Sequence, residues 1–184
     1  MKEPERITIR QATLDDSNAI LAVIDQSARA IAESDYTPEQ IELALQGAFG
    51  LDTQLVKDGT YFVAELDGLI VGCGGWSWRK TLFGGDAIAG RDDEPRDPAT
   101  ESARIRAFFV HPDHMRKGIG RQIVERCELE ARAFGFRRLE LGATLPGERL
   151  YRALGYIASD TYEHECKPGK FMTVIPMSKD ILEK

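Results

Sequence analysis

The sequence predicts a mixed α/β (α+β) fold in which strands alternate with amphipathic helices. Short apolar or alternating runs bounded by turn residues recur along the chain, which is typical of strands. Between them lie segments whose apolar residues recur at helical spacing. The chain has 184 residues, of which 42% are hydrophobic and 29% charged, as in ordinary soluble globular proteins. We expect residues 1–184 to form a single domain without internal repeats.

The first part of the chain predicts one strand and two helices. Residues 6–10 alternate in polarity and favour a strand. N-cap residue types at 15–17 then precede apolar positions at helical spacing, namely Ile20, Leu21, Ile24 and Ala28. After a polar break, Thr37 is placed as the N-cap of a second helix with Pro38 at its first position.

A hairpin and a long loop come next. Two β-rich runs, 61–66 and 69–76, flank the dipeptide Asp67-Gly68, a strong hairpin signal. Residues from about 79 to 100 are rich in Gly, Asp and Pro and show no period. Such a segment is either a lid over a site or an insertion without a role, and the sequence does not decide between them.

The second half predicts a central strand followed by a well-marked helix. Residues 103–110 form the strand, and residues 119–134 place Ile119, Ile123, Cys127, Ala131 and Phe134 on one stripe with Glu128 facing away. Gly135 is placed to end this helix. A strand at 138–143, a short helix at 148–154 closed by Gly155 and a last strand at 171–177 follow.

The segment 108–121, FFVHPDHMRKGIGR, carries the clearest chemical signal. A strand that enters a helix through a glycine loop directs several backbone N–H groups to one point, which favours phosphate. Gly118 and Gly120 lack the Cβ atoms that would hold a phosphate away from the backbone. Arg116, Lys117 and Arg121 concentrate positive charge there, although the formal net charge of the protein is -6.

Other nucleotide signatures fit this loop poorly. A P-loop needs Lys and Ser or Thr after its last glycine, whereas Arg121 and Gln122 follow here. A dinucleotide fingerprint needs a third glycine, and Ile123 stands in its place. A plain tight turn without a ligand is the alternative that the residues leave open.

Composition and charge exclude several classes of protein. The acidic balance argues against nucleic-acid or anionic-membrane partners. Three separated cysteines without a CxxC pair indicate a reducing compartment. Because we see no signal sequence and no membrane-length apolar segment, we expect a cytoplasmic location.

The spacing of His111 and His114 suggests a metal pair, but no third ligand follows, so we expect a loop role and no metal. His164, among Glu163, Glu165 and Cys166, is interpreted as a polar strand end.

The order of elements and two local motifs resemble the GNAT superfamily of N-acetyltransferases. The first motif is Phe109-Val110-His111-Pro112 with Arg116-Lys117-Gly118-Ile119-Gly120-Arg121, and the second is 150–156, LYRALGY. Either is weak alone, but together, separated by one helix and one strand, they are specific. The resemblance covers nearly the whole chain. It implies a mostly antiparallel central sheet, splayed between its two middle strands, with helices on both faces.

The resemblance also implies acetyl-CoA as co-substrate and assigns residues to it. The backbone around Gly118 and Gly120 would hold the pyrophosphate, and the strand before the loop would pair with the pantetheine arm and offer an N–H to the acetyl carbonyl. Met115 replaces the usual Gln or Arg, and Thr144 replaces a frequent Asn. The implied cofactor-binding residues are Phe108, Phe109, Val110, Arg116, Lys117, Gly118, Ile119, Gly120, Arg121 and Thr144.

By the same resemblance, Tyr151 is the general acid that protonates the departing thiolate. The attacking amine must lose a proton, and the candidate bases are Glu65, Glu33 and Asp35. Tyr36, Glu65 and Trp76 are the residues that we expect to border the acceptor, with Trp78 beside them. Each of these has an ordinary structural role as its alternative, since aromatic and charged residues at such positions are common in any fold.

The leading hypothesis is an acetyl-CoA-dependent N-acetyltransferase acting on a primary amine of a small molecule by direct attack in a ternary complex. A non-catalytic module that binds CoA thioesters is the second hypothesis, suggested by Met115 and Thr144. Transfer to a protein N-terminus or lysine is the third. The oligomeric state stays open, and the late strands and residues 79–100 can support a homodimer.

Overall fold

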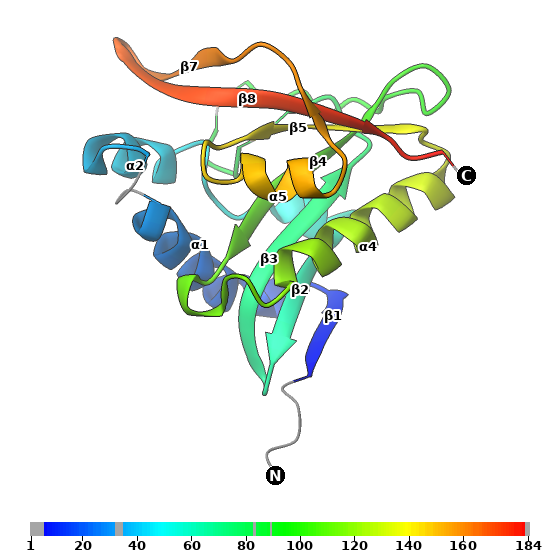
Figure 1. Cartoon of the computed structure of the whole chain (residues 1–184), viewed down its shortest axis with the longest axis horizontal. Helices are drawn as coiled ribbons and strands as arrows, with labels where there is room; N and C mark the ends of the chain where they lie inside the picture. Colours follow the sequence, from blue (N-terminus) through cyan, green and yellow to red (C-terminus); the bar gives the residue numbers. More distant parts are fainter. Residues whose placement is uncertain (1–5, 32–34, 83, 89, 183–184) are drawn as a thin grey trace.

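The computed structural model describes residues 6–31, 35–82, 84–88 and 90–182. Within these, one sheet of eight strands forms the centre of the protein (Figure 1). Its strands are β1 (Ile7–Gln11), β2 (Tyr61–Leu66), β3 (Leu69–Ser77), β4 (Ala103–Val110), β5 (Arg138–Ala143), β6 (Ile157–Ala158), β7 (Tyr162–Lys167) and β8 (Lys170–Asp180). The order is β1-β2-β3-β4-β5-β8-β6, with β7 paired to β8. Every pairing is antiparallel except β4 with β5, which confirms the expected mixed, mostly antiparallel sheet.

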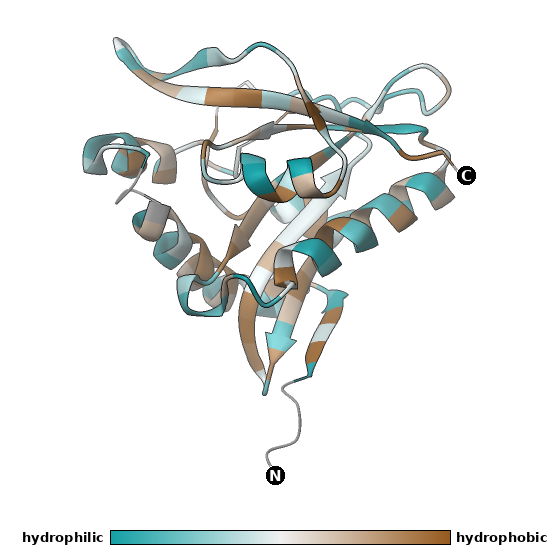
Figure 2. Ribbon diagram, viewed as in Figure 1, coloured by the Kyte–Doolittle hydropathy of each residue, from teal (hydrophilic) through white to brown (hydrophobic). Residues whose placement is uncertain are grey.

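Helices cover both faces of this sheet. They are α1 (Ser17–Ile31), α2 (Pro38–Leu45), α3 (Thr53–Lys57), α4 (Ile119–Phe134) and α5 (Glu148–Ala153), with short 3-10 turns at Leu14–Asp16 and Pro112–His114. Ile119 of α4 and Tyr151 of α5 belong to one hydrophobic cluster, and Ile20, Ile41 and Leu55 of α1, α2 and α3 belong to a second. In Figure 2, α4 alternates between hydrophobic and hydrophilic colour, as expected for a helix with one buried face.

The two middle strands separate after a short common stretch. β4 and β5 pair only at Ala103 with Leu139 and at Arg104 with Glu140. Beyond these pairs, the two halves of the sheet diverge, and β5, β7 and β8 lie across the top of the view in Figure 1. The splay expected from the sequence resemblance is therefore present, and it leaves the facing backbone edges of β4 and β5 without a strand partner.

A bulge bends β4 beside this splay. Cys73 pairs with Phe109 and Gly75 with Arg106, so β4 has one residue more than β3 over this stretch. Ala107 has a positive φ of 50°, a conformation that is uncommon for a residue with a Cβ. The Tyr61 hydroxyl donates a hydrogen bond to the Ala107 carbonyl at 2.8 Å and so holds the bulge in place. Bulges of this kind redirect side chains next to binding sites.

Several local predictions are confirmed. Asp67 and Gly68 both have positive φ, as a two-residue hairpin turn requires. Thr37 caps α2 by accepting a hydrogen bond from the Gln40 N–H, and Pro38 is the first helical residue. Gly135 ends α4 with a φ of 116°. These features depend on a few neighbouring residues, and for that reason they can be predicted from sequence.

Other local predictions were wrong. Thr13 is the N-cap of the 3-10 turn Leu14–Asp16 and forms a capping box with Asp16, whereas Asp15 and Asp16 lie within that turn and Ser17 is the first residue of α1. Glu128 does not face solvent: its carboxylate is buried and accepts hydrogen bonds from the Lys179 ammonium at 2.8 Å. Phe134 is 51% exposed although it lies on the predicted apolar stripe. The sequence patterns also missed α3 and β6, which are short, and indicated β7 only as a polar strand end around His164.

The segment from 79 to 100 has no helix or strand in its described part, but ion pairs hold it to both ends of α3 and to β5. Arg79 forms an ion pair with Asp58 at 2.7 Å, Arg91 with Asp52 at 3.1 Å, and Arg96 with Glu140 at 2.6 Å. Three arginines thus bind three carboxylates that belong to other parts of the chain. This arrangement favours a fixed wall over a free insertion. Within the described residues, no helix has the length and apolar character that crossing a membrane requires.

Candidate active site

A cavity of about 230 Å³ lies where β4 and β5 separate. Its walls are formed by β4, β5, α1 and α5, by the turn after β5, by the loop after α2 and by the 79–100 segment. The lining residues are Ser27, Ala48, Phe49, Gly84, Ile105, Arg106, Ala107, Phe108, Phe109, Val110, Met115, Leu141, Gly142, Ala143, Thr144, Pro146, Gly147, Leu150 and Tyr151. Phe108, Phe109, Val110, Thr144 and Tyr151, all singled out from sequence, meet here.

The N-terminus of α4 lies beside Met115 at one end of the cavity, the cofactor end. Gly118 is the N-cap residue, and no side chain among the described residues caps this helix. The N–H groups of Ile119, Gly120 and Arg121 belong to its first turn, where a helix offers no backbone acceptor. The guanidinium of Arg121 is half exposed and pairs with Glu125 one turn later at 3.4 Å. The loop therefore presents backbone donors and positive charge, the two requirements of an anion site.

The two glycines of this loop have different roles. Gly118 has a φ of 81°, a backbone conformation that side chains disfavour, although a Cβ there would make no close contact, with Gln122 Nε2 4.0 Å away. At Gly120, a Cβ would come within 2.9 Å of Leu150 Cδ2 and 3.5 Å of Phe108 Cζ. Gly118 thus permits the turn, and Gly120 permits α4 to approach α5 and β4.

The edge of β4 that faces the splay carries unpaired backbone groups. The His111 N–H bonds to the Val71 carbonyl at 2.9 Å across the β3–β4 pair. Because antiparallel pairing alternates, the backbone of Val110 points to the opposite edge, toward β5. No strand among the described residues pairs with β4 there, so this edge can receive an extended ligand.

Tyr151 of α5 is buried and lines the cavity. Its ring packs edge-on against Phe108, with centroids 6.0 Å apart, and against Tyr156 at 5.6 Å. Burial raises the pKa of Tyr151 above its ordinary value, so the phenol stays protonated. No residue of the described chain forms a hydrogen bond with its hydroxyl. Within the described chain, the group is therefore a proton donor without a hydrogen-bond partner.

Thr144 and Tyr36 are held by backbone contacts on the β5 side. The Thr144 hydroxyl accepts a hydrogen bond from the Gly147 N–H at 3.3 Å, which leaves its own proton available to the cavity. The Tyr36 hydroxyl donates to the Thr173 carbonyl and accepts from the Leu145 N–H, both at 3.0 Å. Tyr36 joins β8 to the turn after β5 and does not itself line this cavity.

Glu65 and Trp76 do not reach the cavity, contrary to expectation. The Glu65 carboxylate accepts a hydrogen bond from Arg10 at 2.9 Å on the β1–β2 pair, and this bond lowers its pKa. Trp76 is buried against Trp78 and Phe136, with ring centroids 5.6 and 6.2 Å away. Neither residue lines the cavity, because β2 and the far end of β3 lie away from the splay. Asp35 is not a lining residue either.

Glu33, the other candidate base, lies outside the described residues. The expected loop role of His111 is confirmed, since its Nδ1 accepts a hydrogen bond from the Asp113 N–H at 3.2 Å and caps a 3-10 turn. No cluster of three or more His, Cys, Asp or Glu residues in the described part of the chain could hold a metal ion.

Two residues away from the α4 N-terminus, at what we call the acceptor end because the proposal below assigns the acceptor to it, were missed. His164 of β7 lines a second cavity of about 60 Å³, which shares Ala48, Phe49, Gly142, Ala143 and Thr144 with the first. Burial lowers the pKa of His164 below its ordinary value, so its imidazole is neutral at neutral pH. Arg106 of β4 lines the main cavity. An arginine within the apolar run 103–110 was the available signal for it.

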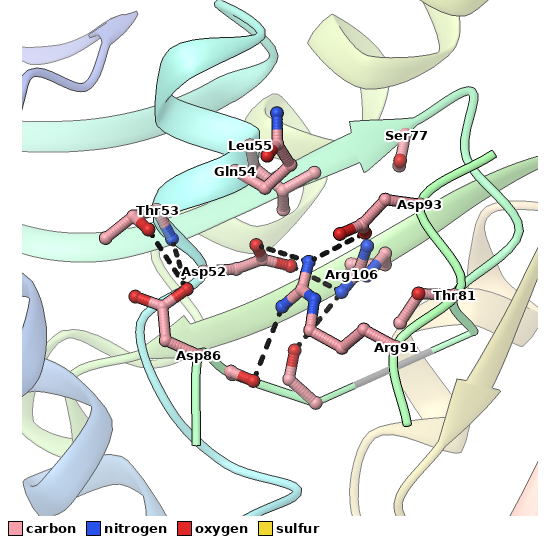
Figure 3. A network of polar contacts seen from close by, with 12 residues as sticks. Asp52, Thr53, Gln54, Leu55, Ser77, Thr81, Asp86, Arg91, Asp93 and Arg106 are labelled. Carbon is pink, nitrogen blue, oxygen red and sulfur yellow. Dashed lines mark hydrogen bonds and ion pairs between the residues drawn. The ribbon is translucent and has the colours of Figure 1, made fainter. Parts of the chain in front are cut away.

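Arg106 belongs to a buried ionic cluster (Figure 3). Its Nη2 lies 2.5 Å from Asp52 Oδ2 and donates to the Gly84 carbonyl at 3.2 Å. Asp52 also accepts a hydrogen bond from Arg91 at 3.1 Å. The side chains of Arg106 and Asp52 are fully buried. Burial lowers the pKa of Arg106, and the Asp52 carboxylate opposes this shift.

Comparisons with known proteins agree with this geometry. Among solved structures, the fold is similar to a GCN5-related N-acetyltransferase from Rhodopseudomonas palustris, with a TM-score of 0.69, 19% identity and coverage of 98% of this chain and 99% of that one. It is also similar to a PaiA N-acetyltransferase from Thermoplasma acidophilum in complex with coenzyme A, with a TM-score of 0.65, 14% identity and coverage of 95% and 99%.

A putative acetyltransferase from Salmonella typhimurium, solved with acetyl-CoA, is similar at a TM-score of 0.63 and 19% identity over 97% of this chain and 96% of that one. Comparison with curated proteins found no match. The family model described as an acetyltransferase (GNAT) domain matches residues 57–158, which include β2 to β6 and therefore the whole splay. The chain belongs to the GNAT family of acetyltransferases.

Proposed function

We propose that the protein transfers the acetyl group of acetyl-CoA to the primary amine of a small molecule, by direct attack in a ternary complex. The splayed cavity carries this proposal, because it joins an uncapped helix N-terminus, a free strand edge and the buried phenol of Tyr151. Bound acetyl-CoA would supply an activated acetyl group and a thiolate leaving group.

The chain offers matching groups along the length of such a ligand. The N–H groups of the first turn of α4, together with Arg116, Lys117 and Arg121, would bind the pyrophosphate. The free edge of β4 at Phe108, Phe109 and Val110 would pair with the pantetheine arm. A β4 N–H aimed at the acetyl oxygen would stabilise its developing charge, and such a donor contributes roughly 3–4 kcal/mol.

Two side chains would move the protons. As the new C–N bond forms and the C–S bond breaks, the Tyr151 hydroxyl gives its proton to the leaving thiolate. An alkyl amine with a pKa of about 10.4 must first lose a proton. His164, neutral and near the acceptor end, would accept it, directly or through water. Among the described lining residues of the two cavities, it is the side chain suited to this role near neutral pH.

The acceptor end favours a small molecule over a protein substrate. Phe49 and Gly84 line it from the loop after α2 and from the tied 79–100 segment. The β7–β8 hairpin is joined to α2 by a hydrogen bond from the Gln40 amide to the Phe171 carbonyl at 2.8 Å. A polypeptide acceptor would need an open groove through these walls.

The test combines ligand binding with turnover. We expect acetyl-CoA to raise the melting temperature and an amine panel to release free thiol. Tyr151→Phe should lower kcat by about 100-fold, a usual general-acid contribution, with little change in the KM for acetyl-CoA. Tyr156→Phe is the matched control, because that buried ring packs on Tyr151 and does not line the cavity.

Equal turnover in Tyr151→Phe would remove the acid role. Stabilisation by acetyl-CoA without thiol release on any amine would instead indicate a binding module.

A further inference from the structure

The bulge in β4 places a strained residue in the wall of the cavity. Ala107 has a φ of 50°, and it lines the cavity together with Phe108. A residue with a Cβ is strained in this region, and the strain persists only where the surrounding structure holds the backbone. Strained backbone of this kind collects at functional sites. The group that holds Ala107 therefore bears on what the cavity does.

Tyr61 of β2 holds this residue from across the sheet. Its side chain is fully buried, and its hydroxyl donates a hydrogen bond to the Ala107 carbonyl at 2.8 Å. β2 and β4 are not neighbours, because β3 lies between them. Tyr61 pairs with Gly75 of β3, where a Cβ would come within 2.8 Å of Tyr61 Cδ2. The absence of a side chain at Gly75 thus leaves room for the ring to reach β4.

A second glycine of β3 leaves room for Phe108. At Gly74, a Cβ would come within 2.5 Å of Phe108 Cδ2. Tyr61 belongs to the hydrophobic cluster of α1, α2 and α3, whereas Phe108 packs against the cluster of α4 and α5. The two rings therefore flank the bulge from opposite faces of the sheet, and the glycines of β3 accommodate both.

The Tyr61 hydrogen bond sets the direction of the next N–H group. The Ala107 carbonyl and the Phe108 N–H belong to one planar trans peptide, so they point in opposite directions. Because Tyr61 reaches the carbonyl from across β3, the Phe108 N–H points away from β3, toward the splay. A hydrogen bond to a carbonyl also polarises its peptide and strengthens the N–H as a donor.

We propose that Tyr61 is a positioning residue for acetyl transfer: by binding the Ala107 carbonyl, it aims the Phe108 N–H at the acetyl oxygen of bound acetyl-CoA. The inference rests on the proposed acetyl transfer and names its backbone donor. As the amine nitrogen bonds to the acetyl carbon, the carbonyl electron pair moves to oxygen, where the Phe108 N–H stabilises it. The pair returns as the C–S bond breaks and Tyr151, which packs against the Phe108 ring, protonates the thiolate.

The first experiment measures the rate of acetyl transfer in Tyr61→Phe, which removes the hydroxyl and keeps the ring. Loss of an oxyanion donor lowers kcat roughly 100- to 1000-fold. Here the donor remains but is no longer aimed, so we expect the single-turnover rate to fall about tenfold, with a change of less than about twofold in the KM for acetyl-CoA.

Tyr156→Phe is the matched control for this rate, because it also removes a hydroxyl from a buried tyrosine that does not line the cavity. We expect its single-turnover rate to equal that of the unmodified enzyme. Melting temperatures establish that both variants are folded. An unchanged rate in folded Tyr61→Phe overturns the inference.

Infrared spectroscopy reads the contact itself, which a merely structural role would not change. Acetyl-CoA labelled with carbon-13 at the acetyl carbonyl is bound without an amine, and its C=O frequency falls as hydrogen bonding to the oxygen strengthens. We expect the band to move to higher frequency in Tyr61→Phe and to stay in place in Tyr156→Phe. An unshifted band in Tyr61→Phe overturns the inference.

Replacement of Tyr61 by 3-fluorotyrosine should shift the band in the opposite direction. The fluorinated hydroxyl is a stronger donor, so it should polarise the peptide more and move the band to lower frequency. Burial raises the pKa of the residue 61 phenol well above its ordinary value, which keeps the fluorinated group protonated at neutral pH. If Tyr61→Phe does not fold, the fluorotyrosine protein decides, and an unshifted band there overturns the inference.

The two readouts separate this inference from the acetyl-transfer proposal. If amines are acetylated but neither the rate nor the band responds to changes at Tyr61, the positioning role fails and the transferase proposal stands. If no amine is acetylated but the band responds, the aimed Phe108 N–H stands and the protein is a binding module for CoA thioesters. Absence of acetyl-CoA binding overturns both.

Discussion

The cofactor end and the acceptor end of the cavity are built in opposite ways. At the cofactor end, consecutive residues 116–121 present backbone N–H groups, and the Arg121 charge is half exposed. At the acceptor end, Asp52, Arg91 and Arg106 come from three separate segments, and their charges are buried (Figure 3). One end uses the backbone of a local motif, and the other uses side chains that only the folded chain brings together.

This difference predicts where charge matters for stability. An exposed ion pair on a helix contributes little because water and salt screen it. A buried pair is costly to break, since the remaining charge stays in an apolar environment without a partner. Substitutions at the two ends should therefore differ in both the size and the kind of their effects.

The largest effect is expected from Asp52→Asn. This change leaves Arg106 and Arg91 without their shared buried carboxylate, and we expect the free energy of unfolding to fall by about 3–5 kcal/mol. Glu125→Gln, which breaks the exposed pair with Arg121, should change it by no more than about 0.5 kcal/mol. Urea denaturation measures both. Similar losses for the two variants would show that burial does not distinguish the two ends.

The next effect is on acetyl-CoA at the cofactor end. Gly120→Glu would place a carboxylate beside the expected pyrophosphate, and like-charge contacts cost several kcal/mol. We expect the KM for acetyl-CoA to rise by about 100-fold. Gly120→Ala adds a Cβ without charge, and its one close contact is the flexible end of Leu150 at 2.9 Å, so its effect should be much smaller. An unchanged KM in Gly120→Glu would remove the loop from the cofactor site.

A smaller effect is expected from His164→Gln at the acceptor end. Burial lowers the pKa of His164 below its ordinary value, so the imidazole is neutral at neutral pH and becomes protonated as the pH falls through that lowered pKa. The kcat/KM for the amine should therefore decline on the acidic side in the unmodified enzyme. The His164→Gln variant should not show this acidic decline, and its kcat/KM should be about tenfold lower than that of the unmodified enzyme. This loss is smaller than a typical general-base contribution because water can accept the proton instead. An unchanged acid limb would exclude His164 as the base.

The sequence by itself determined the features that depend on neighbouring residues. The turn at Asp67-Gly68, the Thr37 cap, the end of α4 at Gly135 and the glycine loop before α4 were all predicted from short motifs. Their geometry follows from local backbone preferences, which a few residues are enough to specify. The splay between β4 and β5 was also expected, but only through the family resemblance.

Only the tertiary structure decided which side chains surround the cavity. Sequence position suggested Glu65 and Trp76, but the strand order places Glu65 beside Arg10 and Trp76 in an aromatic cluster. Arg106 and His164 were not proposed, because neither lies in a motif. Long-range pairing brings them to the cavity, and the distant Asp52 sets the charge around Arg106. Burial and charge balance are properties of contacts between distant segments, so no local pattern in the chain can encode them.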